Sequence, residues 1–148
     1  MVSALLSDCV QLTSTDQVVV LNSAEDAFVS QARHTLQSGA LVLAEDNVST
    51  LGRYRRALAA QPLHFRHVPF HTYLTQQPAA TMDVAVLNLL YQPGKAWMLY
   101  ALSVAAHALR SGGRFYATGA KDRGILSFAR YMQEVFGNVE TLEISKGH

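Results

Sequence analysis

Two acidic residues, Glu45 and Asp46, directly follow the apolar segment 40–44. They come about 20 residues after the turn at 22–26, the spacing at which nucleotide-binding folds place a carboxylate on the hydroxyl groups of a ribose. A structural role is the alternative, since Asp46 or Asn47 could cap the helix expected next. Glu45 and Asp46 are therefore candidates for binding a ribose.

A second polar cluster follows the apolar segment 83–88 in the stretch "DVAVLNLLYQPGK". Asn88 ends that segment, and Tyr91 and Lys95 lie close behind it. Ligands of parallel sheets bind beyond the carboxyl ends of the strands, so this stretch is either a binding loop or a loop whose chemistry has been lost. We interpret Asn88 first as a turn residue and second as a reacting residue, because Asn readily hydrogen-bonds to the backbone of a turn.

Basic side chains gather at two places that could contact RNA phosphates. The rim of the strand ends carries Lys95, Lys121 and Arg123. A second patch combines residues of two expected helices: Arg33, His34, Arg53, Arg55 and Arg56. Charged residues more often form a solvated surface, which is the alternative for both patches.

The histidines and the single cysteine argue against a metal site. His64 and His67 fall in an expected strand, where they point to opposite faces, so they would not share a metal with His71. Cys9 can form neither an intramolecular disulfide nor a cysteine-based zinc cluster. With no basic leader and no long apolar run, these features predict a soluble, cytoplasmic protein.

Length and composition predict one compact domain over residues 1–148. The chain is 49% hydrophobic and 16% charged, which is typical of a soluble globular domain. Its net charge of +1 excludes wholesale neutralisation of phosphates, so any nucleic-acid contact must be local.

Two periodicities alternate along the chain and predict its fold. Short apolar segments typical of buried strands occupy 17–21, 40–44, 64–68, 83–88 and 113–118, with a sixth expected at 138–145. Helical patterns occupy 24–38, 48–60, 96–110 and 122–136, with Asp122 as N-cap of the last. This alternation predicts an α/β fold: a doubly wound, mainly parallel sheet of about six strands with helices on both faces.

The first turn between strand and helix, "NSAED", contains no glycine. A ligand carboxylate or phosphate at this turn needs close approach to the backbone, which glycine permits. The turn instead carries Glu25 and Asp26, which would repel an anion and stabilise the start of the next helix. This argues against a dinucleotide site and against a tightly bound cofactor in the usual place.

The order of elements resembles that of class I S-adenosylmethionine-dependent methyltransferases. "DVAVLNLLYQPGK" is similar to the family's Asn-Pro-Pro-aromatic turn: Asn88 and Tyr91 match its first and last positions, and Leu89 and Leu90 replace the prolines. "LVLAEDNVSTLGRYRRAL" resembles the segment whose acid holds the cofactor ribose. The resemblance implies S-adenosylmethionine as cofactor, with Glu45 or Asp46 on its ribose, and Asn88 and Tyr91 at the target amine.

More specifically, "YQPGKAWMLYALSVAAHALRSGGRFYATGAKDRGILSF" resembles the amino-terminal half of tandem-domain ribosomal RNA guanine-N2 methyltransferases. In that family a degenerate domain precedes the catalytic one. The resemblance implies that residues 1–148 belong to a longer protein, with a catalytic domain in the same parent chain and rRNA as partners. An unpaired sheet edge could alternatively mediate a homodimer.

Two hypotheses follow. In the first, the chain is a methyltransferase-like module without activity of its own, which supports a catalytic partner domain or docks RNA. In the second, it is an active N-methyltransferase acting on a nucleobase amine. The absence of glycine from the first turn favours the first hypothesis.

Overall fold

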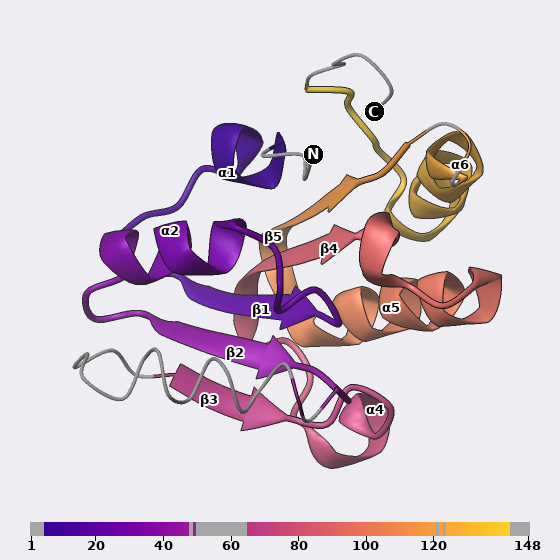
Figure 1. Ribbon diagram of the computed structural model, residues 1–148. Helices are drawn as coiled ribbons and strands as arrows, with labels where there is room; N and C mark the ends of the chain where they lie inside the picture. Colours follow the sequence, from indigo (N-terminus) through magenta and orange to yellow (C-terminus); the bar gives the residue numbers. More distant parts are fainter. Residues whose placement is uncertain (1–4, 48, 50–64, 121, 123, 143–148) are drawn as a thin grey trace.

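The computed structural model describes residues 5–47, 49, 65–120, 122 and 124–142 (Figure 1). Within them, one sheet has the strand order β3-β2-β1-β4-β5, and every neighbouring pair is parallel. Its strands are β1 (Gln17–Leu21), β2 (Ala40–Ala44), β3 (Phe65–Val68), β4 (Met82–Asn88) and β5 (Leu109–Thr118). The order reverses beside β1, which confirms the predicted doubly wound, parallel α/β fold.

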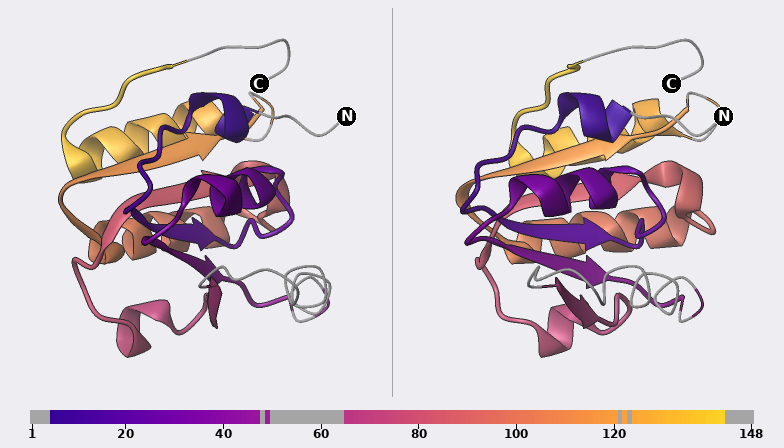
Figure 2. Two further views of the ribbon diagram at one scale, coloured as in Figure 1. Left: turned by 90° about the vertical axis from the view of Figure 1, so that its left-hand side faces the viewer. Right: turned by 60° about the vertical axis from the view of Figure 1, so that its left-hand side comes forward.

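Helices cover both faces of this sheet (Figures 1 and 2). They are α1 (Leu5–Cys9), α2 (Phe28–Thr35), α4 (Tyr73–Gln76), the 3-10 turn η1 (Leu89–Tyr91), α5 (Lys95–Ala108) and α6 (Ile125–Phe136). The helix expected at 48–60 lies outside the described residues apart from Ser49. No helix in the described ranges has the length and apolar character needed to cross a membrane.

Alternation along the strands divides the core into two layers. Val18 and Val20 of β1 pack in a cluster with the buried face of α2, whereas Val19 and Leu21 pack in a cluster with α4, α5 and α6. Successive side chains of a strand point to opposite faces, so a strand covered on both sides must be apolar throughout. This is why β1 and β2 could be located from their composition.

Several element boundaries differ from the sequence prediction: α2 is shorter at both ends than the predicted 24–38, and α5 ends at Ala108 instead of residue 110. Two further differences involve glycines. β5 begins at Leu109 instead of residue 113, because the glycine pair at 112–113 lies in an irregularity of the β4–β5 register and does not end the strand. The N-cap of α6 is Gly124, in the left-handed conformation at φ 87°, so the prediction of Asp122 as N-cap is wrong.

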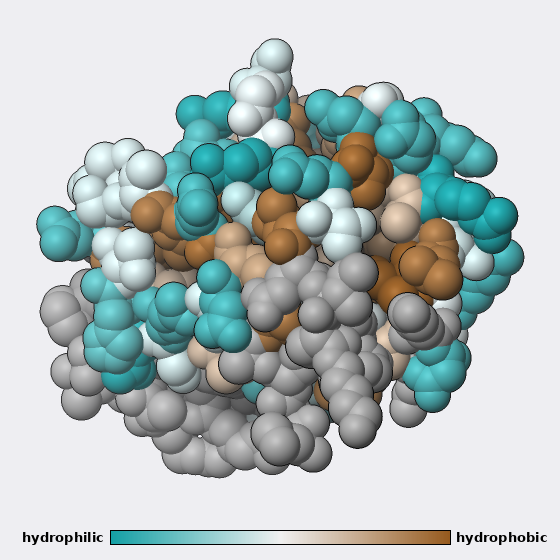
Figure 3. Space-filling view, turned by 90° about the horizontal axis from the view of Figure 1, so that it is seen from above, coloured by the Kyte–Doolittle hydropathy of each residue, from teal (hydrophilic) through white to brown (hydrophobic). Residues whose placement is uncertain are grey.

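The outer edge of β5, which pairs with no strand among the described residues, borders a groove of about 740 Å³. β5 lies at the end of the described sheet, flanked by α1 and α6 (Figures 1 and 2). The sixth strand expected at 138–145 is not present over its described part, residues 138–142, which lines the groove as irregular chain. Figure 3, viewed from the β5 side, shows hydrophobic side chains at the surface among hydrophilic ones.

Candidate ligand site at the strand ends

The carboxyl ends of β1, β2 and β4 lie side by side, with the reversal of strand order between β1 and β4. This is the place where open parallel sheets bind ligands. Glu45 follows β2, and Asn88 ends β4, so the structure brings together the strand ends that carry both groups of predicted site residues.

The first turn bends without glycine because Asn22 adopts a left-handed conformation at φ 46°. Asn reaches this region more readily than other residues with a side chain, since its short amide can hydrogen-bond locally. The backbone N–H of Asn22 donates to the carbonyl oxygen of Ala44 at 2.7 Å, which fixes the turn against the end of β2.

Asp26 turns its carboxylate into the protein and is only 1% exposed. Its Oδ1 accepts from the backbone N–H of Phe28 at 2.9 Å, and its Oδ2 accepts from Asn88 Nδ2 at 2.7 Å. The first contact satisfies an N–H at the start of α2, as expected of an acid there. The second contact, between the first turn and the end of β4, could not be predicted from the local sequence.

Asn88 is held by protein groups at both ends of its side chain. Besides donating to Asp26, it accepts from the backbone N–H of Leu90 through Oδ1 at 2.9 Å and so caps η1. Its own N–H donates to Ser23 Oγ at 2.9 Å, and that hydroxyl donates to the carbonyl oxygen of Leu21 at 2.8 Å. In this geometry Asn88 serves the turn after β4 as a capping residue.

Gln92 joins the turn after β1 to the turn after β4, a role that was not predicted from the sequence. Its Nε2 donates to the carbonyl oxygens of Asn22 at 3.0 Å and Asn88 at 3.1 Å. Its Oε1 accepts from Asn22 Nδ2 at 3.1 Å. Ser23, Asp26, Asn88 and Gln92, all buried, are here called the switch-point network.

Glu45 directs its carboxylate at the backbone around it. Oε1 accepts from the N–H of Ala24 at 3.3 Å, and Oε2 accepts from the N–H of Asn47 at 3.1 Å. Burial raises the pKa of this carboxyl above its usual value, and the neighbouring charge of Asp46 adds to the rise, while backbone hydrogen bonds oppose it. Asn47 Oδ1 in turn accepts from the N–H of Ser49.

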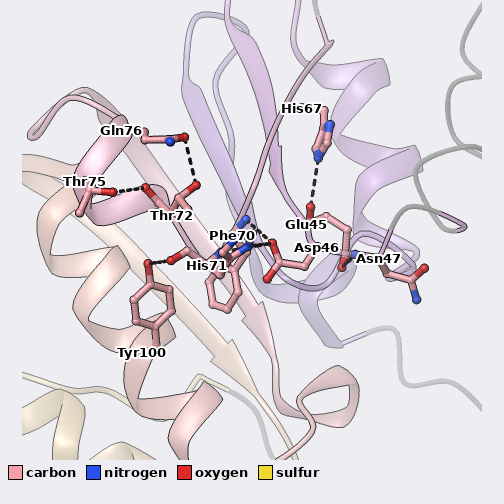
Figure 4. A network of polar contacts seen from close by, with 10 residues as sticks. All are labelled: Glu45, Asp46, Asn47, His67, Phe70, His71, Thr72, Thr75, Gln76 and Tyr100. Atoms are coloured by element: carbon pink, nitrogen blue, oxygen red, sulfur yellow. Dashed lines mark hydrogen bonds and ion pairs between the residues drawn. The ribbon is translucent and has the colours of Figure 1, made fainter.

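Asp46 ties the end of β2 to the chain after β3 (Figure 4). Its Oδ1 accepts from the backbone N–H groups of Phe70 at 2.8 Å and His71 at 3.2 Å, and lies 2.8 Å from His71 Nδ1. The hydroxyl of Tyr100 donates to the His71 carbonyl oxygen at 2.8 Å. His67 Nε2 hydrogen-bonds to the Glu45 carbonyl oxygen at 3.0 Å, so His67 and His71 have separate partners.

The remaining candidate residues lie around this site. Tyr91 lies in η1 and is partly exposed. Lys95 begins α5 and is exposed, with its ammonium group 5.5 Å from the ring centroid of Tyr131. Lys121 and Arg123 lie outside the described residues, as do Arg53, Arg55 and Arg56 of the second basic patch.

Strand order, two-sided helical cover and solved relatives together define the fold of class I S-adenosylmethionine-dependent methyltransferases. The 16S rRNA N2 G methyltransferase RsmC of T. thermophilus, solved with AdoMet and guanosine, matches 97% of this chain at 22% identity and a TM-score of 0.73. The chain covers only 35% of that RsmC chain.

Two further solved structures share the fold. A TehB-like methyltransferase from Corynebacterium glutamicum matches 89% of this chain and 70% of its own, at 13% identity and a TM-score of 0.67. TrmN from Thermus thermophilus matches 87% of this chain and 39% of its own, at 17% identity and a TM-score of 0.64. No protein-family model matches the sequence. No curated protein matches it significantly.

Proposed function

We propose that this chain is a methyltransferase-like domain without activity of its own, which supports a catalytic domain in the same parent chain and takes part in docking rRNA. The observation that carries the proposal is the switch-point network. At the ends of β1 and β4, where the strand order reverses, four buried side chains hydrogen-bond to one another and to the local backbone. They are those of Ser23, Asp26, Asn88 and Gln92.

The residues at the first turn do not fit the amino-acid end of S-adenosylmethionine. A bound carboxylate needs N–H donors and a bare backbone, whereas the turn presents the buried carboxylate of Asp26 and a side chain at every position. Both oxygens of Glu45 already accept from backbone N–H groups, and the amide of Asn88 is bonded at both ends.

The competing hypothesis is an active N-methyltransferase. It would place Glu45 or Asp46 on the ribose of S-adenosylmethionine, and Asn88 and Tyr91 at a nucleobase amine. Ligand binding would then require the bonds between Asp26, Asn88 and Gln92 to open, at a cost because each buried polar group would lose its partner.

Calorimetric titration with S-adenosylmethionine and S-adenosylhomocysteine separates the two hypotheses. We expect no heat of specific binding and no rise in Tm at millimolar ligand, because a ligand that binds only the folded state must stabilise it. Micromolar binding of either ligand would contradict the proposal. The same titration of an active class I methyltransferase is the positive control.

The rRNA part of the proposal has its own measurement. Fluorescence anisotropy of a labelled RNA should report binding that weakens as salt rises, since phosphate contacts release counterions. Absence of binding at low salt would remove the RNA role and leave the supporting role standing.

We propose that the catalytic partner domain packs against the groove at β5. This chain covers only 35% of RsmC, which shares its fold, so RsmC carries substantial further chain. The groove offers an edge of β5 that no described strand pairs with, and exposed apolar side chains such as Leu126 and Leu142, which are 64% and 54% exposed. A second copy of this chain is the competing occupant.

A further inference from the structure

A rigid aromatic cluster lies at the rim of the strand ends. Phe70, after β3, stacks on Trp97 in the first turn of α5, with ring centroids 6.1 Å apart and an angle of 23° between the rings. Tyr100 packs edge-on against Phe70 at 5.2 Å. Phe70 and Tyr100 are further fixed by hydrogen bonds: Asp46 accepts from the Phe70 N–H, and the Tyr100 hydroxyl donates to the His71 carbonyl oxygen.

One member of this cluster is open to solvent. Phe70 is fully buried, but Trp97 is 37% exposed, and Leu90 beside the end of β4 is 44% exposed. Packing in the core accounts for the burial of the Phe70 ring. It does not account for the part of the Trp97 indole that is exposed to solvent. Because a flat ring backed by a second ring is already ordered, a planar ligand could stack on it at little entropic cost.

Charge around Trp97 favours an anionic ligand. From Val84 to Lys121 the sequence contains no Asp or Glu, and the basic residue nearest to Trp97 in this stretch is Lys95. Lys95 lies two residues before Trp97 and is exposed. His71, whose side chain is 62% exposed, lies next to Phe70 in sequence, and its Nδ1 contacts the nearby carboxylate, that of Asp46. Asp46 is in turn occupied by three donors.

We infer that Trp97, backed by Phe70, is a stacking platform for an unpaired nucleobase of RNA. Lys95 lies in the same first turn of α5, with its ammonium group over the Tyr131 ring at 5.5 Å, and His71 follows Phe70 in the chain. Every base offers an aromatic face, so such a platform tolerates different sequences, and the ammonium group of Lys95 meets an adjoining phosphate. This inference rests on the proposed docking of RNA and names the surface that performs it. It assigns to Trp97, Phe70 and His71 a role that is separate from the switch-point network.

Trp97 is the only tryptophan of the chain, so its fluorescence reports directly on the platform. The experiment titrates the protein with a purine-rich single-stranded RNA and with a duplex of the same sequence, and follows both Trp97 emission and the anisotropy of labelled RNA. We expect the single strand to quench Trp97 over the concentration range in which anisotropy rises. The duplex, whose bases are already stacked, should quench it much less.

Matched variants separate stacking from general apolar contact. Trp97→Leu keeps an apolar side chain but removes the aromatic face, and should weaken binding of the single strand by about 5- to 100-fold. Trp97→Phe should retain most of the affinity. Lys95→Gln should weaken binding and reduce the salt dependence by about one phosphate contact. Circular dichroism melting curves check that each variant is folded.

The outcomes are distinguishable. RNA could bind without a change in Trp97 emission, or Trp97→Leu could bind RNA as tightly as the unchanged protein. Either result would contradict the stacking role of Trp97 but not the docking of RNA. If no RNA binds at low salt, both the stacking role of Trp97 and the proposed docking of RNA are contradicted. If S-adenosylhomocysteine quenches Trp97 and single-stranded RNA does not, the aromatic pair belongs to a cofactor site and the inference is overturned.

Discussion

At the scale of single residues, the central contact of the candidate site is the hydrogen bond between the side chains of Asp26 and Asn88. Both side chains are almost completely buried, and they join the turn after β1 to the end of β4. A carboxylate without such partners would be costly to bury, so the two residues depend on each other. Asn88, the candidate for binding a target amine, thereby donates its side-chain hydrogen bond to the carboxylate of Asp26.

We predict that Asp26→Ala lowers the free energy of unfolding by about 1–3 kcal/mol, because it leaves buried donors of Asn88 and Phe28 without their acceptor. Urea unfolding measures the loss. The double variant with Asn88→Ala should lose less than the sum of the single variants. Glu25→Ala, at the exposed neighbouring acid, is the control, and an equal loss there would contradict the prediction.

Glu45 predicts a pH effect on stability. Burial raises the pKa of this carboxyl in the folded protein above 4.5, so the folded state holds its proton more tightly than the unfolded state. The contribution of Glu45 to stability is therefore greatest at acid pH and is lost as pH rises from 4.5 through the raised pKa.

Comparison with Glu45→Gln isolates this contribution. The stability of the unchanged protein relative to the variant should decline over that pH window and become constant above it. Thermal or urea unfolding at a series of pH values measures the difference. A difference that does not change between pH 4.5 and neutrality would show that the raised pKa of Glu45 is wrong.

At the scale of elements, backbone contacts fix how strands begin. Gly39 precedes β2, and a Cβ atom at this position would overlap the carbonyl oxygen of Asp16. The chain before β1 and the chain before β2 therefore approach as closely as they do only because Gly39 has no side chain.

Gly39→Ala should destabilise the protein by about 3 kcal/mol or more, since relief of the overlap requires one of the two segments to move. Gly94→Ala is the matched control, because a Cβ atom there has no neighbour within 4 Å and the backbone is extended. Because Gly94 is the N-cap of α5 and Ala is a poorer N-cap than Gly, that control should cost about 1 kcal/mol or less. Similar effects of the two substitutions would rule out the proposed overlap.

Elements whose limits depend on composition could be predicted from the sequence. The limits of β1 and β2 agree with the sequence prediction because both strands are buried on two faces and end in polar turns. The start of β5 and the start of α6 could not be predicted, because they depend on whether Gly112 and Gly124 bend the chain or continue it.

The site was predictable only in part, for a related reason. The position of Glu45, Asp46 and Asn88 at adjacent strand ends follows from the parallel order of the strands. Their partners do not, because Asp26 and Asn88 are 62 positions apart in sequence and meet only after the sheet has formed. Nothing local to Gln92 marks it as the residue that joins the two turns.

At the scale of the whole molecule, β5 is one of the two edge strands of the described sheet, and the groove lies beside it. An unpaired strand beside exposed apolar side chains tends to acquire a partner. If the partner is a domain of the same parent chain, the isolated chain should sediment as a monomer at micromolar concentration.

Leu126→Lys tests that expectation on the groove itself. Leu126 is 64% exposed, so the substitution should leave the stability of the isolated chain within about 0.5 kcal/mol of its original value. Analytical ultracentrifugation of both proteins should show monomers. A dimer that Leu126→Lys dissociates would identify a second copy as the occupant and contradict docking of a partner domain.

Closure of the strand ends by Ser23, Asp26, Asn88 and Gln92 has a consequence for the life of the protein in a cell. Proteins whose binding cleft must be filled to be stable become more susceptible to proteolysis when their small-molecule ligand is scarce. Under the proposed function, the buried side chains of the switch-point network take the place of such a ligand. The abundance of the protein should therefore not vary with the metabolic supply of methyl donor.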